Sequence, residues 1–447
     1  MGNEAKSVRV EPKILKGVRD YLPDLEGPRQ EMLQRVKAAF ERFGYGPLQT
    51  PAIEYAEILL GKGGDEADKL LYRFIDNGER DVALRYDLTV PLARVVAMYG
   101  DLVMPFRRHQ VAPVWRAEKP AKGRFREFVQ CDADLVGEPS VRGDAEIMMV
   151  GLAVLAALEV PGYVMRVNDR RILDGVLDVV GIEKSARIAV LRVVDKLPKV
   201  GPDAVRAEIK EQVALGDDAD QRIDRLFALL FREVGSDADL VRLGEEIAAS
   251  EVGRAGIAGL RELLSILEGA GVRERVAVDL TIARGLDYYT STIYETFLAG
   301  HESYGSVMSG GRYDGLMGTF SGKPTPAVGI SLGVDRLLAA LTDLGLAGTR
   351  RAGADVFFCL FDVADYPAIA KVSNELRALG LGVEVALGGG KLGKQLQLAT
   401  RKGYRFALLQ GGDERARGEV VAKDLVSGTQ ETLSLATAAS WIPRLRS

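Results

Sequence analysis

Two strand-like segments with one polar face constrain the fold more than any other feature of the chain. Residues 103–116 and 126–137 are separated by a short basic loop, a pattern typical of a long antiparallel hairpin. Side chains alternate between the two faces of a strand, so every second residue of the later segment points the same way. The residues on that face are Arg126, Phe128, Gln130, Asp132 and Asp134. Such a face is too polar for a core, and we interpret it as the floor of a pocket.

The segments around this hairpin differ in character. Apolar spacing predicts an amphipathic helix over 28–43 and an apolar helix over 141–158. Residues 170–275 are helical in pattern and rich in charge, and we predict that they form an inserted helical domain. Strand and turn character returns over 277–298 and 304–333.

The last hundred residues show a different alternation. A helix is expected from Val334, and residues 349–353 look like a linker. Strands are then expected near 355–361, 382–387 and 405–410, with helices near 365–379 and 391–402. Strands alternating with helices predict a separate α/β domain of ordinary size.

Composition excludes several kinds of chemistry. The only histidines, His109 and His301, rule out a multi-histidine metal site and argue against histidine general-base catalysis. Cys131 and Cys359 form no CxxC pair, so we expect neither a cysteine zinc site nor a disulfide framework, and a reducing, cytoplasmic location fits. The net charge of -4 restricts nucleic-acid binding to local basic surfaces. No apolar run is long enough to predict a membrane span.

No P-loop and no strand-associated GxGxxG occurs, so a nucleotide would have to be held in another way. Arginines suit that task because guanidinium groups bind phosphate oxygens in pairs. Arg116, Arg284 and Arg336 stand beside predicted strands, turns or helix starts. A surface salt bridge is the simpler explanation for any one of them. Their joint occurrence with the motifs below favours a functional site.

The motifs give a specific resemblance. Residues 116–128 (RAE, then GRFREF) resemble motif 2 of class II aminoacyl-tRNA synthetases, and residues 333–336 (GVDR) resemble motif 3. Residues 283–289 (ARGLDYY) and 309–316 (SGGRYDGL) resemble the two signatures of histidyl-tRNA synthetases. Further matching segments are 16–23, 84–89 and 45–51, the last similar to motif 1. The resemblance covers nearly the whole chain.

The resemblance implies an α+β catalytic domain with a mixed, mainly antiparallel sheet, a helical insertion and a C-terminal α/β anticodon-binding domain. The expected boundaries are 1–169 and 276–345 for the catalytic domain, 170–275 for the insertion and 353–447 for the anticodon-binding domain. It also implies a homodimer that activates histidine with ATP and Mg²⁺ and charges tRNA(His). No protein ligand of a metal can be assigned from the sequence.

Roles for individual residues follow from the resemblance alone. The implied ATP-binding residues are Arg116 at the α-phosphate, Glu118 at the adenine amino group, Phe128 and Arg336 on the two faces of adenine, and Gly333. The implied catalytic residues are Arg116, Arg336 and Arg284. Of these, Arg284 would neutralise charge where the substrate carboxylate attacks the α-phosphate. Lys119, Lys122 and Arg124 are implied to contact the acceptor end of the tRNA.

The histidine site is implied in the same way. Asp87, Thr89 and Gln130 would bind the α-amino group, Asp134 and Tyr289 would bracket the imidazole, and Tyr288 and Tyr313 would line the pocket. Simpler explanations stay open: Asp87 could cap a helix, and the tyrosines could pack between strands. Gly310 and Gly311 could be turn residues or could let the backbone approach the ligand. Asp87 and Asp134 depart from the glutamates of the common bacterial pattern, and Ala121 replaces a glutamine near the extra 5′ guanosine of the tRNA.

Three other assignments compete. One is the synthetase-like regulatory subunit of ATP phosphoribosyltransferase, which usually lacks the anticodon domain and has degraded signatures. A second is a class IIa synthetase for proline, glycine or threonine, which would not carry the segment 283–289. The third is a protein that kept only the fold, in which buried charged pocket residues would be a costly remnant.

Overall fold

The computed structural model describes residues 10–61, 68–120, 123–213, 216, 218–283, 289–346 and 353–446, without the side chains of 198 and 199. The chain divides into two compact units. One comprises residues 1–19 and 32–345, and the other comprises residues 20–31 and 346–447. Most of the predicted linker, 349–353, lies outside the described residues.

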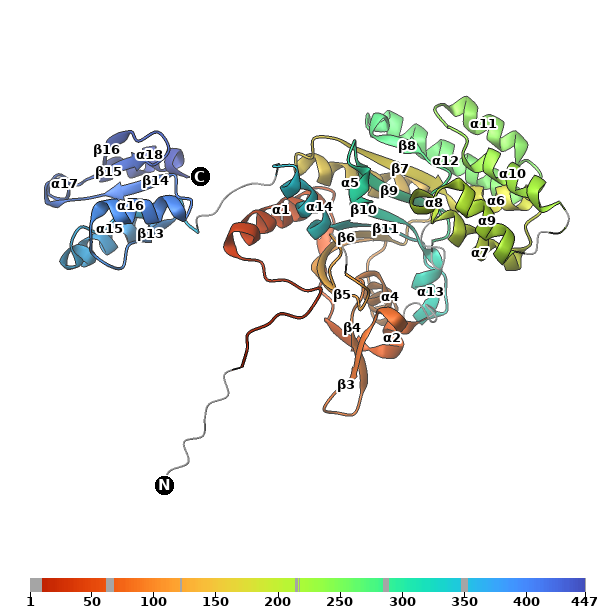
Figure 1. The fold of residues 1–447 in the computed structure, drawn as a ribbon, viewed down its shortest axis with the longest axis horizontal. Helices are drawn as coiled ribbons and strands as arrows, with labels where there is room; N and C mark the ends of the chain where they lie inside the picture. The colour runs from red at the N-terminus through yellow and green to blue at the C-terminus, as the bar shows by residue number, and fades with distance from the viewer. Residues whose placement is uncertain are drawn as a thin grey trace, which may run out of the picture. The chain divides into compact units, whose positions relative to one another are not determined.

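An eight-stranded sheet forms the centre of the first unit (Figure 1). Its strands, in spatial order, are β1 (Gly46–Pro47), β5 (Phe106–Trp115), β6 (Glu127–Val136), β11 (Ala327–Gly333), β10 (Met308–Arg312), β9 (Thr292–Leu298), β7 (Tyr163–Asp169) and β8 (Val276–Val278). Only the outer pairs, β1 with β5 and β7 with β8, run parallel. The prediction of a mixed, mainly antiparallel sheet is therefore confirmed.

The predicted hairpin is formed by β5 and β6. Their register runs from Phe106 opposite Val136 to Trp115 opposite Glu127. Arg126 was wrongly placed on the polar face, because it precedes β6. Its guanidinium donates instead to the backbone carbonyls of Glu118 and Lys16.

Helices cover this sheet and extend from it. The apolar helix α5 (Val141–Ala157) matches its prediction and packs against β11, while α14 (Val334–Asp343) packs against β6. Helix α1 (Pro23–Arg42) begins five residues before the predicted start at 28. Pro23 suits a first turn, where a missing N–H leaves no hydrogen bond unmade.

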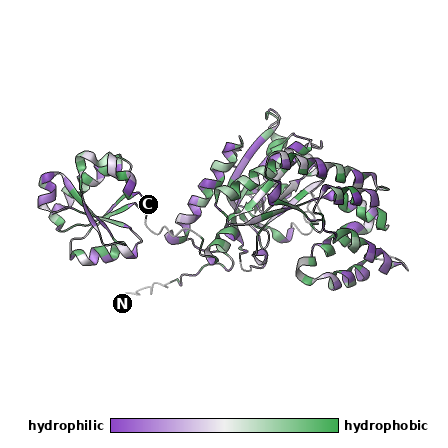
Figure 2. Cartoon of the chain, turned by 90° about the horizontal axis from the view of Figure 1, so that it is seen from above, coloured by the Kyte–Doolittle hydropathy of each residue, from purple (hydrophilic) through white to green (hydrophobic). Residues whose placement is uncertain are grey.

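In the described part of the chain, seven helices lie between β7 and β8. They are α6 (Arg170–Val180), α7 (Lys184–Val194), α8 (Leu197–Val200), α9 (Pro202–Gln212), α10 (Ala219–Leu230), α11 (Asp237–Glu246) and α12 (Glu251–Gly269). Hydrophobic and hydrophilic residues alternate along the helices, as expected for elements with one packed face (Figure 2). The predicted helical character of this run is confirmed, and the exact domain boundaries stay a prediction.

Among the described residues, a small sheet and several helices also belong to the first unit near the polar face. The sheet has the order β2 (Ile53–Tyr55), β4 (Asp81–Leu84), β3 (Tyr72–Ile75). The helices are α2 (Ala56–Leu60), α4 (Thr89–Met98) and α13 (Asp314–Ser321). Helix α13 was not predicted, because its glycine-rich sequence was interpreted as strand and turn.

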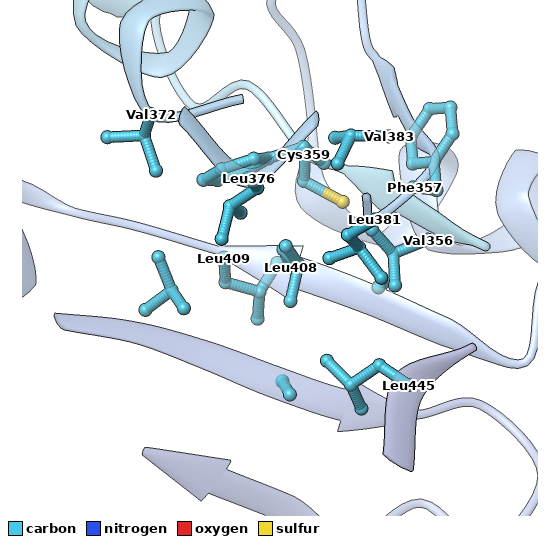
Figure 3. Close-up of a cluster of buried hydrophobic side chains, with 14 of the residues drawn as sticks. Val356, Phe357, Cys359, Val372, Leu376, Leu381, Val383, Leu408, Leu409 and Leu445 are labelled. Atoms are coloured by element: carbon cyan, nitrogen blue, oxygen red, sulfur yellow. The ribbon is translucent and has the colours of Figure 1, made fainter. Parts of the chain in front are cut away.

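The second unit contains a five-stranded sheet of order β13 (Val383–Val385), β12 (Val356–Phe358), β14 (Phe406–Leu409), β15 (Glu419–Asp424), β16 (Gln430–Ser434). The first three strands are parallel and connect through α15 (Tyr366–Ala378) and α16 (Leu392–Arg401), as predicted. The antiparallel strands β15 and β16 and the helices α17 (Gly412–Arg417) and α18 (Ala438–Leu445) were not anticipated. Phe357, Leu376 and Leu408 belong to its apolar core (Figure 3).

Candidate active site

A cavity of about 760 Å³ lies on the polar face of the large sheet. Strands β6, β10 and β11 supply its floor. Side chains from α2, α4, α13 and α14 supply its walls. Residues from two separate stretches of the chain, 59–134 and 289–336, therefore meet at one site.

The floor confirms the alternation expected from the sequence. Phe128, Gln130, Asp132 and Asp134 all line the cavity from β6. The neighbouring strand β11 places small residues opposite them, with Ser331 beside Asp132 and glycine at 329 beside Asp134. The large polar side chains of β6 therefore lie beside small residues of β11.

Asp134 is held by two buried groups. The Tyr313 hydroxyl donates to Asp134 Oδ1, and Arg108 Nη2 lies 2.7 Å from Asp134 Oδ2. Arg108 is completely buried and also donates to the Leu88 carbonyl at 3.1 Å. Burial raises the pKa of Asp134, and the Arg108 guanidinium opposes that shift. Arg108 was missed in the sequence, although the hairpin register places it opposite Asp134.

Gln130 and Asp132 lie next to Ser331. Gln130 Nε2 donates to Ser331 Oγ at 2.8 Å. Burial raises the pKa of Asp132 to about 7, and Arg108 partly opposes the shift. Asp132 had no assigned role, although the strand alternation already placed it on the same face as Gln130.

Asp87 fulfils the capping alternative and also faces the cavity. Its Oδ1 accepts from the Val90 amide at 3.1 Å in the first turn of α4. Asp87 and Thr89 both line the cavity, so capping does not exclude ligand contact. Burial raises the pKa of Asp87 to about 6, while Arg116 and Arg108 lower it.

Two of the three predicted arginines line the cavity, together with Glu118, Arg124 and the glycine at 333. Arg116 Nε donates to the Tyr86 carbonyl at 3.0 Å, and its guanidinium carbon lies 5.1 Å from the centre of the Phe128 ring. Arg336 donates to the Ser306 carbonyl. Both arginines therefore contact backbone carbonyls while they line the cavity.

The other predicted site residues lie in the cavity, on the exposed surface or outside the described residues. Tyr289 and Tyr313 line the cavity. Arg284, Tyr288 and Lys122 lie outside the described residues. Lys119 and Arg124 are exposed, and Arg124 Nη1 lies 3.8 Å from Glu118 Oε2.

Two glycines of the second signature have a packing role that the sequence did not reveal. A Cβ at Gly310 would lie 2.1 Å from the carbonyl oxygen of Gly329, and one at Gly311 would lie 2.5 Å from the carbonyl oxygen of Thr292. The turn interpretation is wrong, because both residues lie inside β10. The absent side chains allow close packing of neighbouring strands and of the Tyr289 ring.

Among the described residues, no group of three or more histidine, cysteine, aspartate or glutamate side chains could hold a metal ion. No helix in that part of the chain is long and apolar enough to cross a membrane. Cys131 and Cys359 are both free and buried.

An antiparallel sheet that carries a polar, arginine-lined cavity, together with a smaller sheet-and-helix unit, defines the class II aminoacyl-tRNA synthetase fold. The family model "Histidyl-tRNA synthetase" matches residues 17–337, and the model "Anticodon binding domain" matches residues 359–445. The chain therefore belongs to the histidyl-tRNA synthetase family.

Individual relatives agree with this assignment. A histidine–tRNA ligase of Rhodopirellula baltica is 42% identical over 421 residues, which are 94% of this chain and 94% of that protein. A histidine–tRNA ligase of Wolinella succinogenes is 40% identical and covers 96% of this chain and 98% of its own length. The crystal structure of histidyl-tRNA synthetase from Nostoc sp. PCC 7120 superposes with a TM-score of 0.88 at 33% identity, covering 98% of this chain and 100% of that chain. The resemblance inferred from the motifs is thus confirmed.

Proposed function

We propose that this chain is a histidine–tRNA ligase. It joins histidine to ATP to form histidyl-adenylate and pyrophosphate, and then transfers histidine to the 3′ end of tRNA(His). One observation carries the proposal: residues implied for ATP and residues implied for histidine line the same cavity, although they come from distant segments of the chain. Family membership supports it independently.

Adenylation requires fixed positive charge more than a base. The histidine carboxylate is ionised near neutral pH, so it attacks the α-phosphorus without prior loss of a proton. Negative charge then develops on the phosphate oxygens, where preorganised cations stabilise it. We assign Arg116 to the α-phosphate and Arg336 to the γ-phosphate. Arg284 is assigned by resemblance to the reacting carboxylate and α-phosphate.

The remaining nucleotide contacts follow from the cavity lining. Phe128 and Arg336 are proposed to lie on opposite faces of adenine, with Glu118 accepting from its amino group. Phe128 already lies beside the Arg116 guanidinium, so a base stacked there would be close to the phosphate-binding arginine. Gly333, at the junction of β11 and α14, is proposed to leave room for the nucleotide.

Histidine is proposed to bind over β6. Asp87, Thr89 and Gln130 are assigned to the α-amino group, and Asp134 with Tyr289 to the imidazole. Tyr313 and Tyr288 are assigned to the pocket lining. The buried Arg108 supports this arrangement, because its contact with Asp134 fixes the carboxylate at the floor.

Partners belong to the same proposal. The exposed Lys119 and Arg124, with Lys122, are assigned to the acceptor end of the tRNA, and the second unit to its anticodon. We further propose a homodimer, a cytoplasmic location and entry of Mg²⁺ with the ATP phosphates. Among the described residues, the cavity carboxylates form no group that could hold a metal ion.

Histidine-dependent exchange of pyrophosphate into ATP tests the proposal directly. Exchange should occur with histidine and not with proline, glycine or threonine. Arg336→Ala should reduce the rate by about 100-fold or more, as expected when a charge-stabilising donor is removed. Arg73→Ala is a matched control, because Arg73 pairs with Asp68 and Asp81 away from the cavity. Absence of exchange from folded protein that still binds histidine would favour the regulatory-subunit alternative.

A further inference from the structure

Three buried acceptor atoms on the cavity floor lack a hydrogen-bond donor among the described residues, and one of them, Asp134 Oδ2, has an ion pair with Arg108. Gln130 Oε1 and Asp132 Oδ1 have no hydrogen-bond partner among the described residues. Gln130 is 7% exposed and Asp132 is 2% exposed, and both line the cavity. The Gln130 amide nitrogen is already committed to Ser331, so its oxygen remains available. A buried acceptor without a donor is unfavourable unless a ligand supplies one.

The charged groups nearby have partners of their own, although Arg108 Nε and Nη1 are buried without an acceptor among the described residues. Arg108 contacts Asp134 and the Leu88 carbonyl, and Tyr313 donates to Asp134. Asp87 accepts from the backbone of α4. Asp134 therefore has two side-chain partners inside the protein, whereas Asp132 has a hydrogen bond with Ser331 and an Oδ1 atom without a donor among the described residues.

The charge balance points the same way. The carboxyls of Asp87, Asp132 and Asp134 all interact electrostatically at this site, and Arg108 is the cation whose charge opposes the burial of both Asp132 and Asp134. Arg116 acts on Asp87. Carboxyls that outnumber the nearby buried cation favour a positively charged ligand.

We infer that Asp132 is a further substrate-binding residue, which together with Gln130 accepts hydrogen bonds from the α-ammonium group of histidine. This inference rests on the proposed function and adds a residue to its amino-acid site. An ammonium group carries three donors, whereas each imidazole nitrogen carries at most one. The Cα atoms of residues two apart on a strand are about 7 Å apart, so two inclined side chains can meet at one nitrogen.

Proton release follows from this arrangement. Burial, together with the carboxyls of Asp134 and Asp87, holds the pKa of Asp132 near 7 in the free protein. A bound ammonium group favours the ionised carboxylate and lowers that pKa. Histidine binding near pH 7 should therefore transfer a fraction of a proton from Asp132 to the buffer.

Two histidine analogues separate an ammonium-binding role from a structural one. Histidinol keeps the ammonium group but lacks the carboxylate, and 3-(imidazol-4-yl)propionate keeps the carboxylate but lacks the ammonium group. Asp132→Asn should weaken histidinol binding by at least about 30-fold, the lower range for losing a partner of a buried charge pair. Binding of the propionate analogue should change by less than about threefold. Asp279→Asn, which alters a carboxylate that pairs with Arg166 outside the cavity, is the control.

Calorimetry in two buffers of different ionisation enthalpy gives the second measurement. The natural protein should release protons on binding histidinol at pH 7, and Asp132→Asn should release fewer. Gln130→Met, which removes the other acceptor, should reproduce the selective loss if Asp132→Asn does not fold.

Two outcomes would overturn the inference: histidinol affinity within threefold of the natural protein, or equal losses for both analogues. Failure of the proposed function would be distinguishable, because the natural protein itself would then show no histidine-dependent exchange.

Discussion

The buried ion pair between Asp144 and Arg312 gives the most quantitative prediction about stability. Asp144 is 1% exposed and Arg312 is 4% exposed. Arg312 Nε lies 3.2 and 3.1 Å from the two carboxylate oxygens, and Nη2 lies 2.5 Å from Oδ2. Arg312 also donates to the carbonyls of Glu138 and Ser140 at 2.9 and 3.0 Å. The pair therefore ties the end of β10 to the start of α5.

Removing one partner leaves an uncompensated buried charge, which costs about 3–5 kcal/mol. Asp144→Ala should fall at the lower end of that range, because Arg312 keeps its two carbonyl acceptors and the Asp314 carboxylate at 3.4 Å. Arg312→Met should cost more, since it strands the Asp144 carboxylate and leaves both carbonyls without their donor, at about 1–3 kcal/mol for each unsatisfied group. The double variant should cost less than the sum of the single variants by about 2 kcal/mol, because the two changes remove the same interaction.

Urea unfolding followed by tryptophan fluorescence measures these differences in the free energy of unfolding, and the position of the tryptophan decides which of the two units is observed. The chain has two tryptophans, Trp115 in the first unit and Trp441 in the second. A Trp441→Phe background leaves Trp115, on β5, as the reporter of the unit that contains the ion pair. Additive effects within about 0.5 kcal/mol, or a cost below about 1 kcal/mol for Asp144→Ala, would refute the reasoning.

Three further predictions concern the cavity. Tyr313→Phe removes the hydroxyl that donates to Asp134 and should raise the KM for histidine by about 5- to 50-fold, with the KM for ATP unchanged in the exchange assay. Gly329→Ala would place a Cβ 2.0 Å from Asp134 Oδ1 and should abolish histidine binding in calorimetry, whereas Gly235→Ala, with no atom within 4 Å, should not. Because the pKa of Asp132 is about 7 in the folded chain and 3.8 ordinarily, this carboxyl binds more protons in the folded state, so its contribution to stability should fall as pH rises from 4 to 8. Between these pH values, the free energy of unfolding should therefore drop by up to ~4 kcal/mol more in the natural protein than in Asp132→Asn.

The sequence could predict one part of the site, because side chains alternate between the two faces of a strand. It placed Gln130 and Asp134 on one face without any knowledge of the rest of the molecule. The prediction that Arg126 lies on this face was wrong, because β6 begins one residue later. The end of a strand is set by pairing with a neighbouring strand, which the sequence pattern does not fix. Arg108 was out of reach for a related reason: its role depends on which residue faces it across the hairpin, and side-chain alternation alone does not fix that register.

The fold was predictable where local patterns were strong. Helix α5 follows directly from its apolar sequence, and the parallel strands of the second unit follow from their alternation with helices. Helix α13 was missed because glycines at 315 and 318 weaken its helical pattern, while packing against α4 stabilises it in the folded chain. The antiparallel strand β15 depends on pairing with β14, and β16 depends on pairing with β15, which composition does not reveal.

The absence of side chains at Gly310 and Gly329 limits how the substrate range of this protein could be changed by engineering. Both residues line the cavity and already have the smallest possible volume, so no substitution there can enlarge the pocket. Space for a bulkier amino acid has to come from the opposite wall, where Leu59 on α2 and Phe320 on α13 provide apolar side chains that can be shortened. A library aimed at new substrates would therefore vary the helices and leave the sheet intact.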